Sequence, residues 1–216
     1  MSLIPHGLLF ETRQRIARIA ASQRSKLQPL DEQYRLRDQN GLDGRTVFAD
    51  LRVGWNEAGL LFDLRVEGKQ QAPLCDVDKP EGSDGLLLWI DTRNTPGVHR
   101  ANRFCHLFCA QPTGAGKNRQ SAFVVQQEIG RCREASPLAN SSEMACESKL
   151  SKRGYSMTVW LGSKALNGFD PEQSPVLGFY YAVRDRELGT QTFGLGEEFP
   201  YRTDPTLWQS LEMKHD

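Results

Sequence analysis

The sequence predicts an all-β protein, an antiparallel β-sandwich of immunoglobulin-like or jelly-roll-like layers with short helical turns. Three observations support this fold class. Apolar and polar side chains alternate through many short segments, helical periodicity is scarce, and Gly, Pro, Asn and Asp interrupt the chain frequently. This combination is typical of half-buried strands that pair in antiparallel sheets, so a sandwich or a barrel is expected.

The clearest alternation lies in two segments joined by a tight turn. Every second residue is apolar in 47–55, and the same holds in 60–66. The intervening residues 56–59 read Asn-Glu-Ala-Gly, a composition that favours a turn. We therefore predict a half-buried antiparallel hairpin.

Later segments differ in how many of their faces are apolar. Residues 86–90 and 176–183 are apolar on both faces, which predicts central strands that are covered on both sides. A loop is expected at 92–102, followed by a strand at 103–110. The remaining predictions are strands at 122–129, 144–150, 155–161 and 191–195, a helical turn at 163–167, and a final segment at 208–213.

The chain before the hairpin has a different character. We predict residues 1–42 to be an irregular lead-in that packs on the domain, and residues 43–216 to form one β-sandwich. Leu9, Ile16 and Ile19 fit one side of a short helix, but a strand fits almost as well, and both alternatives stay open. The first 37 residues carry seven Lys or Arg against three acids.

Composition narrows the function classes. Twenty-seven basic and 27 acidic residues give no net charge, so the sequence predicts neither nucleic-acid nor membrane partners. No apolar run approaches the roughly 20 residues that cross a bilayer. Five cysteines without paired spacing predict free, mostly buried thiols in a reducing compartment, and we expect a cytoplasmic protein.

Five motifs follow one another in a specific order. They read VGWNEAGLLFDLRVEGK, SDGLLLWIDTRN, GYSMTVWLGSKALNGF, VLGFYYAVRD and TDPTLWQSLEM. In this order, over about residues 43 to 213, they resemble the family 9 carbohydrate-binding modules and their DOMON-like relatives. The resemblance implies a β-sandwich of two antiparallel sheets without catalytic activity, which binds a sugar or, in related branches, haem.

The ligand positions implied by this resemblance are occupied by other residue types. The two Trp of the sugar-binding members align with Glu81 and Arg202, their Glu aligns with Leu87, and their Arg and Asn fall nearest Cys105 and Leu107. A pyranose needs flat aromatic faces and polar partners for its hydroxyls. We therefore expect this face to be covered, with the N-terminal lead-in as the candidate cover.

A charged cluster surrounds the loop at 92–102 and predicts a different site. Arg93, His99, Arg103 and Tyr201 are the candidate ligand-binding residues, because Arg recognises anions through a planar fork. The simpler interpretation is that these Arg pair with Asp91 or nearby acids and fix the loop. The expected partner is a saccharide or small anionic ligand, with a protein partner as the alternative.

Two further functions stay open at this point. The first is an enzyme that uses His99, His106 and the nearby Arg, and the second is a haem-binding redox module. No cofactor and no metal are expected, since the spacing of His99, Cys105, His106 and Cys109 fits no zinc signature. Gly114–Lys117 lacks the remaining residues of a phosphate-binding loop. Tyr201 and Trp208 are expected to be partly exposed.

Overall fold

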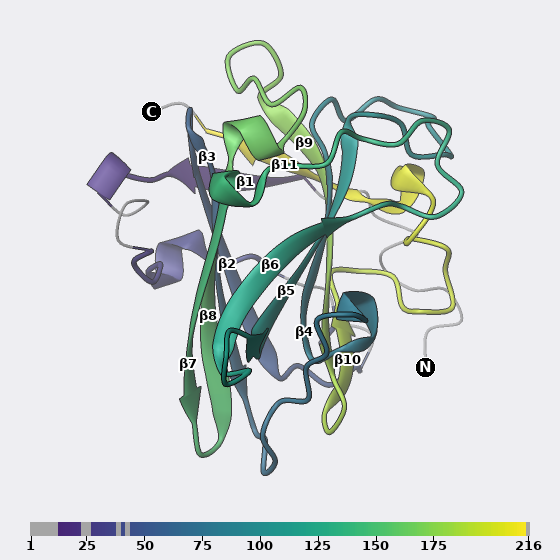
Figure 1. The fold of residues 1–216 in the computed structure, drawn as a ribbon. Helices are drawn as coiled ribbons and strands as arrows, with labels where there is room; N and C mark the ends of the chain where they lie inside the picture. Colours follow the sequence, from purple (N-terminus) through teal and green to yellow (C-terminus); the bar gives the residue numbers. More distant parts are fainter. Residues whose placement is uncertain (1–12, 23–26, 38–39, 42–43, 215–216) are drawn as a thin grey trace.

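A computed structural model describes residues 13–22, 27–37, 40–41 and 44–214. Within them the chain is a sandwich of two facing sheets, with short 3-10 turns between strands (Figure 1). The all-β prediction is therefore confirmed. The strands are β1 (Arg13–Arg18), β2 (Ala49–Asn56), β3 (Gly59–Glu67), β4 (Gly85–Asp91), β5 (Cys105–Ala115), β6 (Ser121–Gln127), β7 (Met144–Ser151), β8 (Gly154–Gly162), β9 (Val176–Asp185), β10 (Gly189–Thr192) and β11 (Gln209–Met213).

Hydrogen-bonded pairing links the strands of both sheets into one continuous order. This order is β6-β5-β4-β9-β11-β1-β2-β3-β8-β7, and β10 pairs with β9. We call β6-β5-β4-β9-β11 with β10 sheet A, and β2-β3-β8-β7 sheet B. The predicted hairpin is β2–β3, and its register pairs Val53 with Phe62. The apolar segments 86–90 and 176–183 pair as β4 and β9 inside sheet A.

Strand β1 connects the two sheets and belongs to the lead-in. It runs parallel to β11 of sheet A and parallel to β2 of sheet B. Ile16 is buried, and the open choice between helix and strand is settled as strand at this residue. Leu9 lies outside the described residues. These two parallel pairings are the exceptions to the antiparallel pattern among the named strands, and they arise because β1 is not the arm of a hairpin.

Two aromatic and apolar layers hold the molecule together. Phe62 of β3 stacks on Phe179 of β9 with ring centroids 6.0 Å apart, so the central core lies between the sheets. A smaller cluster covers the outer face of sheet B, where Ile19, Leu30 and Tyr34 pack with Leu61 and Trp160. Removing this apolar surface from water favours the docking of the lead-in.

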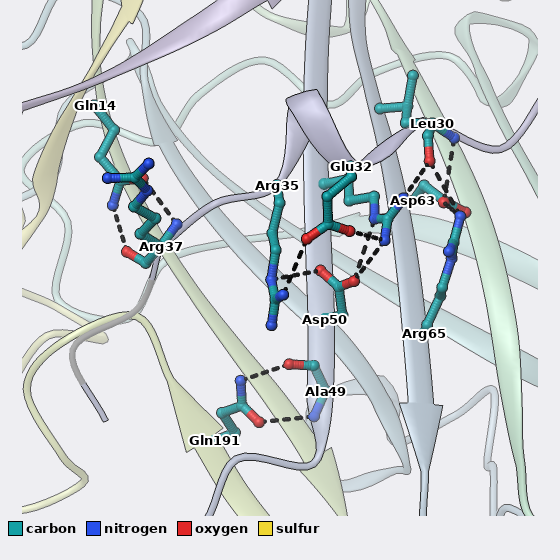
Figure 2. Close-up of polar contacts among 11 residues, drawn as sticks. Gln14, Leu30, Glu32, Arg35, Arg37, Ala49, Asp50, Asp63, Arg65 and Gln191 are labelled. Atoms are coloured by element: carbon teal, nitrogen blue, oxygen red, sulfur yellow. Dashed lines mark hydrogen bonds and ion pairs between the residues drawn. The ribbon is translucent and has the colours of Figure 1, made fainter. Parts of the chain in front are cut away.

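Charged side chains fix residues 27–37 on sheet B, and we call this segment the strap (Figure 2). The Leu30 amide donates to Asp63 Oδ2 at 3.2 Å, and the Leu30 carbonyl accepts from Arg52 Nη1 at 2.8 Å. Arg65 Nη2 donates to Asp63 Oδ2 at 3.1 Å. Burial raises the pKa of Asp63, although Arg65 and the Leu30 amide oppose this shift. The strap is thus tied to a buried carboxyl.

Candidate functional site

The outer face of sheet A carries the positions that the family resemblance assigns to a sugar site. Register places Leu87 and Trp89 of β4 on one face with Leu107 and Cys109 of β5. All four side chains are buried. The expectation that this face is covered is therefore correct.

The cover includes Tyr201 from the loop between β10 and β11. Its ring stacks on Tyr180 at 4.4 Å between centroids and meets Trp89 edge-on at 5.4 Å. Trp208 Nε1 donates to the Tyr201 carbonyl at 2.7 Å. The lead-in was the expected cover, but its described residues Ile19, Leu30 and Tyr34 pack on sheet B instead. The contribution of residues 1–12 lies outside the described residues.

The expected partial exposure of Tyr201 and Trp208 is wrong. Tyr201 has no exposed surface, and Trp208 is 6 % exposed. Trp89 of β4 and Tyr180 of β9 provide a surface on which the Tyr201 ring loses contact with water, and Trp208 is buried as part of the same apolar core. The Tyr201 side chain offers no open aromatic face to a ligand.

An ion pair occupies the two positions that the resemblance assigns to tryptophan. Glu81 Oε2 lies 3.8 Å from Arg202 Nη1, and Arg202 Nη2 lies 3.5 Å from Glu197 Oε1. The Arg202 guanidinium also lies 6.0 Å from the centre of the Tyr201 ring. Charged groups therefore take the place of stacking surfaces here.

Asp84 opens the central-strand motif, and hydrogen bonds and an ion pair within the protein hold its carboxylate. Its carboxylate accepts hydrogen bonds from the amides of Leu74 and Arg186. Buried Lys69 lies 3.5 Å from Asp84 Oδ2 and 2.5 Å from Asp185 Oδ2. These contacts join the loop after β3 to the start of β4 and the end of β9.

A pocket of about 350 Å³ opens where the loops of sheet A gather. His99 lines it from the β4–β5 loop, together with Asp204 from the β10–β11 loop, and its other lining residues are Arg100, Arg131, Pro200 and Thr203. Of the four predicted ligand-binding residues, only His99 lines this pocket. Arg131 also lines the pocket and was not among the predicted residues, because its left-handed backbone (φ +58°) is not visible in a residue pattern.

The chemistry of the pocket depends on how its polar groups are held. His99 Nδ1 lies 3.1 Å from Asp204 Oδ2, and its Nε2 has no hydrogen-bond partner among the described residues. Arg100 donates to the carbonyls of Arg131 and Cys132 at 3.1 and 3.3 Å. Burial raises the pKa of Asp204, but hydrogen bonds from Thr206 and His99 outweigh it and lower the pKa below its usual value.

The two other predicted ligand residues lie around Phe104. The guanidinium groups of Arg93 and Arg103 lie 5.2 and 5.1 Å from the centre of its ring. Arg93 Nη1 donates to Ser174 Oγ at 2.9 Å, and Arg103 lies 4.0 Å from Glu134. Both contacts fix the loop. The predicted pairing of Arg93 with Asp91 takes the form of a bond from the Arg93 amide to Asp91 Oδ1 at 2.9 Å.

His99 and His106 lie in different environments. His106 is fully buried and stacks on Phe108, whereas the His99 side chain is 74 % exposed. The Gln126 amide lies 3.4 Å from His106 Nδ1, and His106 Nε2 lies 3.4 Å from the Asn167 carbonyl. Burial lowers the pKa of His106 to about 4, so this ring is neutral near pH 7. Within the described residues, no cluster of three His, Cys, Asp or Glu side chains could hold a metal ion.

Comparisons with known proteins identify the fold. A family 9 carbohydrate-binding module from Caldicellulosiruptor kristjanssonii in complex with cellotriose superimposes with a TM-score of 0.57 at 14 % sequence identity, covering 95 % of both chains. A module of the same family and organism in complex with glucose gives a TM-score of 0.53 at 12 % identity, covering 95 % of this chain and 97 % of the other. No protein-family model and no curated protein matches the sequence.

The chain therefore has a family 9 carbohydrate-binding-module-like β-sandwich fold, as its motif order predicted. At these identities the likeness defines the architecture. In the part of the chain that the structure describes, no helix has the length and apolar character needed to span a membrane.

Proposed function

We propose that this protein is a non-catalytic saccharide-binding module whose ligand enters the pocket beside His99. The observation that carries the proposal is the likeness in fold, over 95 % of the chain, to modules solved with cellotriose and glucose. Because Glu81 and Arg202 form an ion pair above buried Tyr201, the ligand has no aromatic platform on the outer face of sheet A. The loop pocket offers a polar alternative.

The pocket suits a hydroxyl-rich or anionic ligand. The free Nε2 of His99 can donate to or accept from a hydroxyl, according to its tautomer. Arg131 is exposed, and its side chain has no partner among the described residues, so it is available to a carboxylate or a hydroxyl. The volume of about 350 Å³ lies in the range of small-ligand sites.

A glycan array followed by titration calorimetry tests this function. We expect a saccharide whose affinity falls about tenfold in H99A/R131S, which corresponds to the loss of about one good polar contact. R93S/R103S is the matched comparison and distinguishes the residues of the sequence prediction from those of the pocket. If no saccharide or anion binds or raises the melting temperature, the proposal is wrong.

The cellular setting is part of the same proposal. All five cysteines are free, and Cys105 and Cys109 are buried, so we infer a reducing compartment such as the cytoplasm. Fractionation of cells with an antibody against the protein tests this inference, and recovery outside the cell would contradict it. A protein partner, an enzyme site and haem binding stay predictions of the sequence, and an absorption spectrum with added haemin tests the last of them.

A further inference from the structure

A groove rich in arginine lies on the side of the molecule where β1, the strap and β2 meet. It consists of two hollows of about 670 and 640 Å³, and Arg35 lines both of them. We call their combined surface the arginine groove. Its charged residues are six arginines, Arg13, Arg15, Arg35, Arg37, Arg65 and Arg153, and four acids, Glu32, Asp50, Glu67 and Glu212.

The groove is assembled from segments that are far apart in the chain. Strand alternation points Arg13 and Arg15 to one side of β1, and both reach Glu212 of the neighbouring β11, at 3.2 and 3.3 Å. Two hydrogen bonds between Gln14 and the Arg37 backbone fasten the end of the strap beside them (Figure 2). The arginines of the lead-in thus gather on one surface, although the net charge of the whole sequence is zero.

The arginines differ in how far their charge is neutralised. Arg35 lies 3.1 Å from Glu32 and 3.4 Å from Asp50, with both carboxylates beside it in Figure 2. Arg37 and Arg153 are exposed, and neither guanidinium has a partner among the described residues. Two unpaired guanidinium groups therefore lie in the same surface as arginines that are already held by ion pairs. An unpaired guanidinium can bind a carboxylate in bidentate geometry.

The arginine groove contains both positive and negative side chains, and this mixture limits which polyanions it can bind. Six arginines against four acids leave two net positive charges, and the carboxylates would repel a chain with a phosphate at every unit. The aromatic side chain that lines the groove is Phe48, which is half-buried and packs against the central core, so its ring is not an open platform for a stacking base. Carboxylates and the amide of Gln33 can instead pair with hydroxyls.

We propose that the arginine groove binds a glycan chain with widely spaced carboxylates, such as a uronate-containing polysaccharide. Arg37 and Arg153 hold the carboxylates, and the flanking acids and amides hold the hydroxyls. The inference rests on the proposed saccharide-binding function for its ligand class, but it does not depend on the pocket beside His99. It gives the protein a second, charge-selective surface formed by the lead-in together with the strands and turns beside it.

Titration calorimetry with a hyaluronan oligosaccharide, which carries one carboxylate per disaccharide, tests this proposal. We expect binding that weakens as salt rises, because screening shortens the reach of exposed charges to about 8 Å at physiological ionic strength. R37S/R153S should bind about tenfold more weakly, as expected when charged hydrogen bonds are lost. Its fold should persist because neither side chain has a partner to leave unpaired, and circular dichroism checks this.

The controls separate this proposal from its competitors. K117S/R119S removes two positive charges from the exposed β5–β6 turn and should bind as the wild type does. H99A/R131S should also retain hyaluronan binding, so that failure of the groove and failure of the pocket are distinguishable. The proposal is overturned by absence of binding, by an unchanged affinity in R37S/R153S, by equal binding of the carboxyl-reduced oligosaccharide, or by tighter binding of a single-stranded oligonucleotide.

Discussion

Glu81 and Arg202 form an ion pair with 3.8 Å between Oε2 and Nη1, and this pair stands where the family resemblance places two tryptophans. The side chains are 43 % and 36 % exposed, so water screens their attraction. Directly beneath lies Tyr201, with its ring against Tyr180 and Trp89. Charged side chains above a buried tyrosine ring thus stand at the positions where the resemblance implies exposed aromatic rings.

The ion pair itself should contribute little to stability. E81Q and R202Q should each change the free energy of unfolding by less than about 1 kcal/mol, as exposed pairs do. Urea denaturation measures the effect. D185N is the contrasting variant, because the buried Asp185 carboxylate faces Lys69 at 2.5 Å and its loss should cost about 3 kcal/mol. Equal effects in the two cases would contradict this interpretation.

Asp63 should be the residue on which the docking of the strap depends. D63A leaves the Leu30 amide and the Arg65 guanidinium without their buried acceptor, which should cost about 3 kcal/mol. Hydrogen exchange should then accelerate at Leu30 more than in the β3–β8 ladder. E32Q is the control, because the Glu32 side chain is 67 % exposed and its loss should cost less than about 1 kcal/mol.

His106 should make the protein less stable in acid. Its pKa in the folded state is about 4, against 6.5 for the free side chain, so the unfolded chain binds a proton that the folded one excludes. The stability due to this group is complete above pH 6.5 and falls by up to about 1.4 kcal/mol per pH unit between 6.5 and 4. H106Q should flatten the profile in this window. A His106 proton signal that titrates near 6.5 in nuclear magnetic resonance would exclude the mechanism.

The five cysteines should divide into two reactivity classes. Burial raises the pKa of Cys105 and Cys146 to about 12, and it raises that of Cys109 as well. The thiolate is the reactive form, so these three should resist alkylation in the native protein. Cys75, Cys132 and Cys146 are all half-buried, but the pKa values of Cys75 and Cys132 are raised less, so these two should react first, and urea should expose all five. Mass spectrometry after brief iodoacetamide treatment counts the labels, and native labelling of Cys105 would contradict the burial argument.

Much of the fold could be predicted from local pattern. Alternation at 47–55 and 60–66 predicted β2 and β3, and apolar runs on both faces predicted β4 and β9, each within a few residues. Even so, Ile16 fitted a helix and a strand alike, because its alternation extends over only a few residues. The site was harder to predict, since only His99 of the four expected residues lines the pocket.

The sequence by itself determined which segments become strands and which fold they resemble. Side-chain alternation with period two is a local property, and it decides which face of a strand can be buried. Only the tertiary structure decided that β1 runs parallel between the two sheets, that Tyr201 closes the outer face of sheet A, and that Arg37 and Arg153 line two hollows that share Arg35. These relationships join residues up to about two hundred positions apart, and they depend on strand register and loop paths that no local pattern encodes.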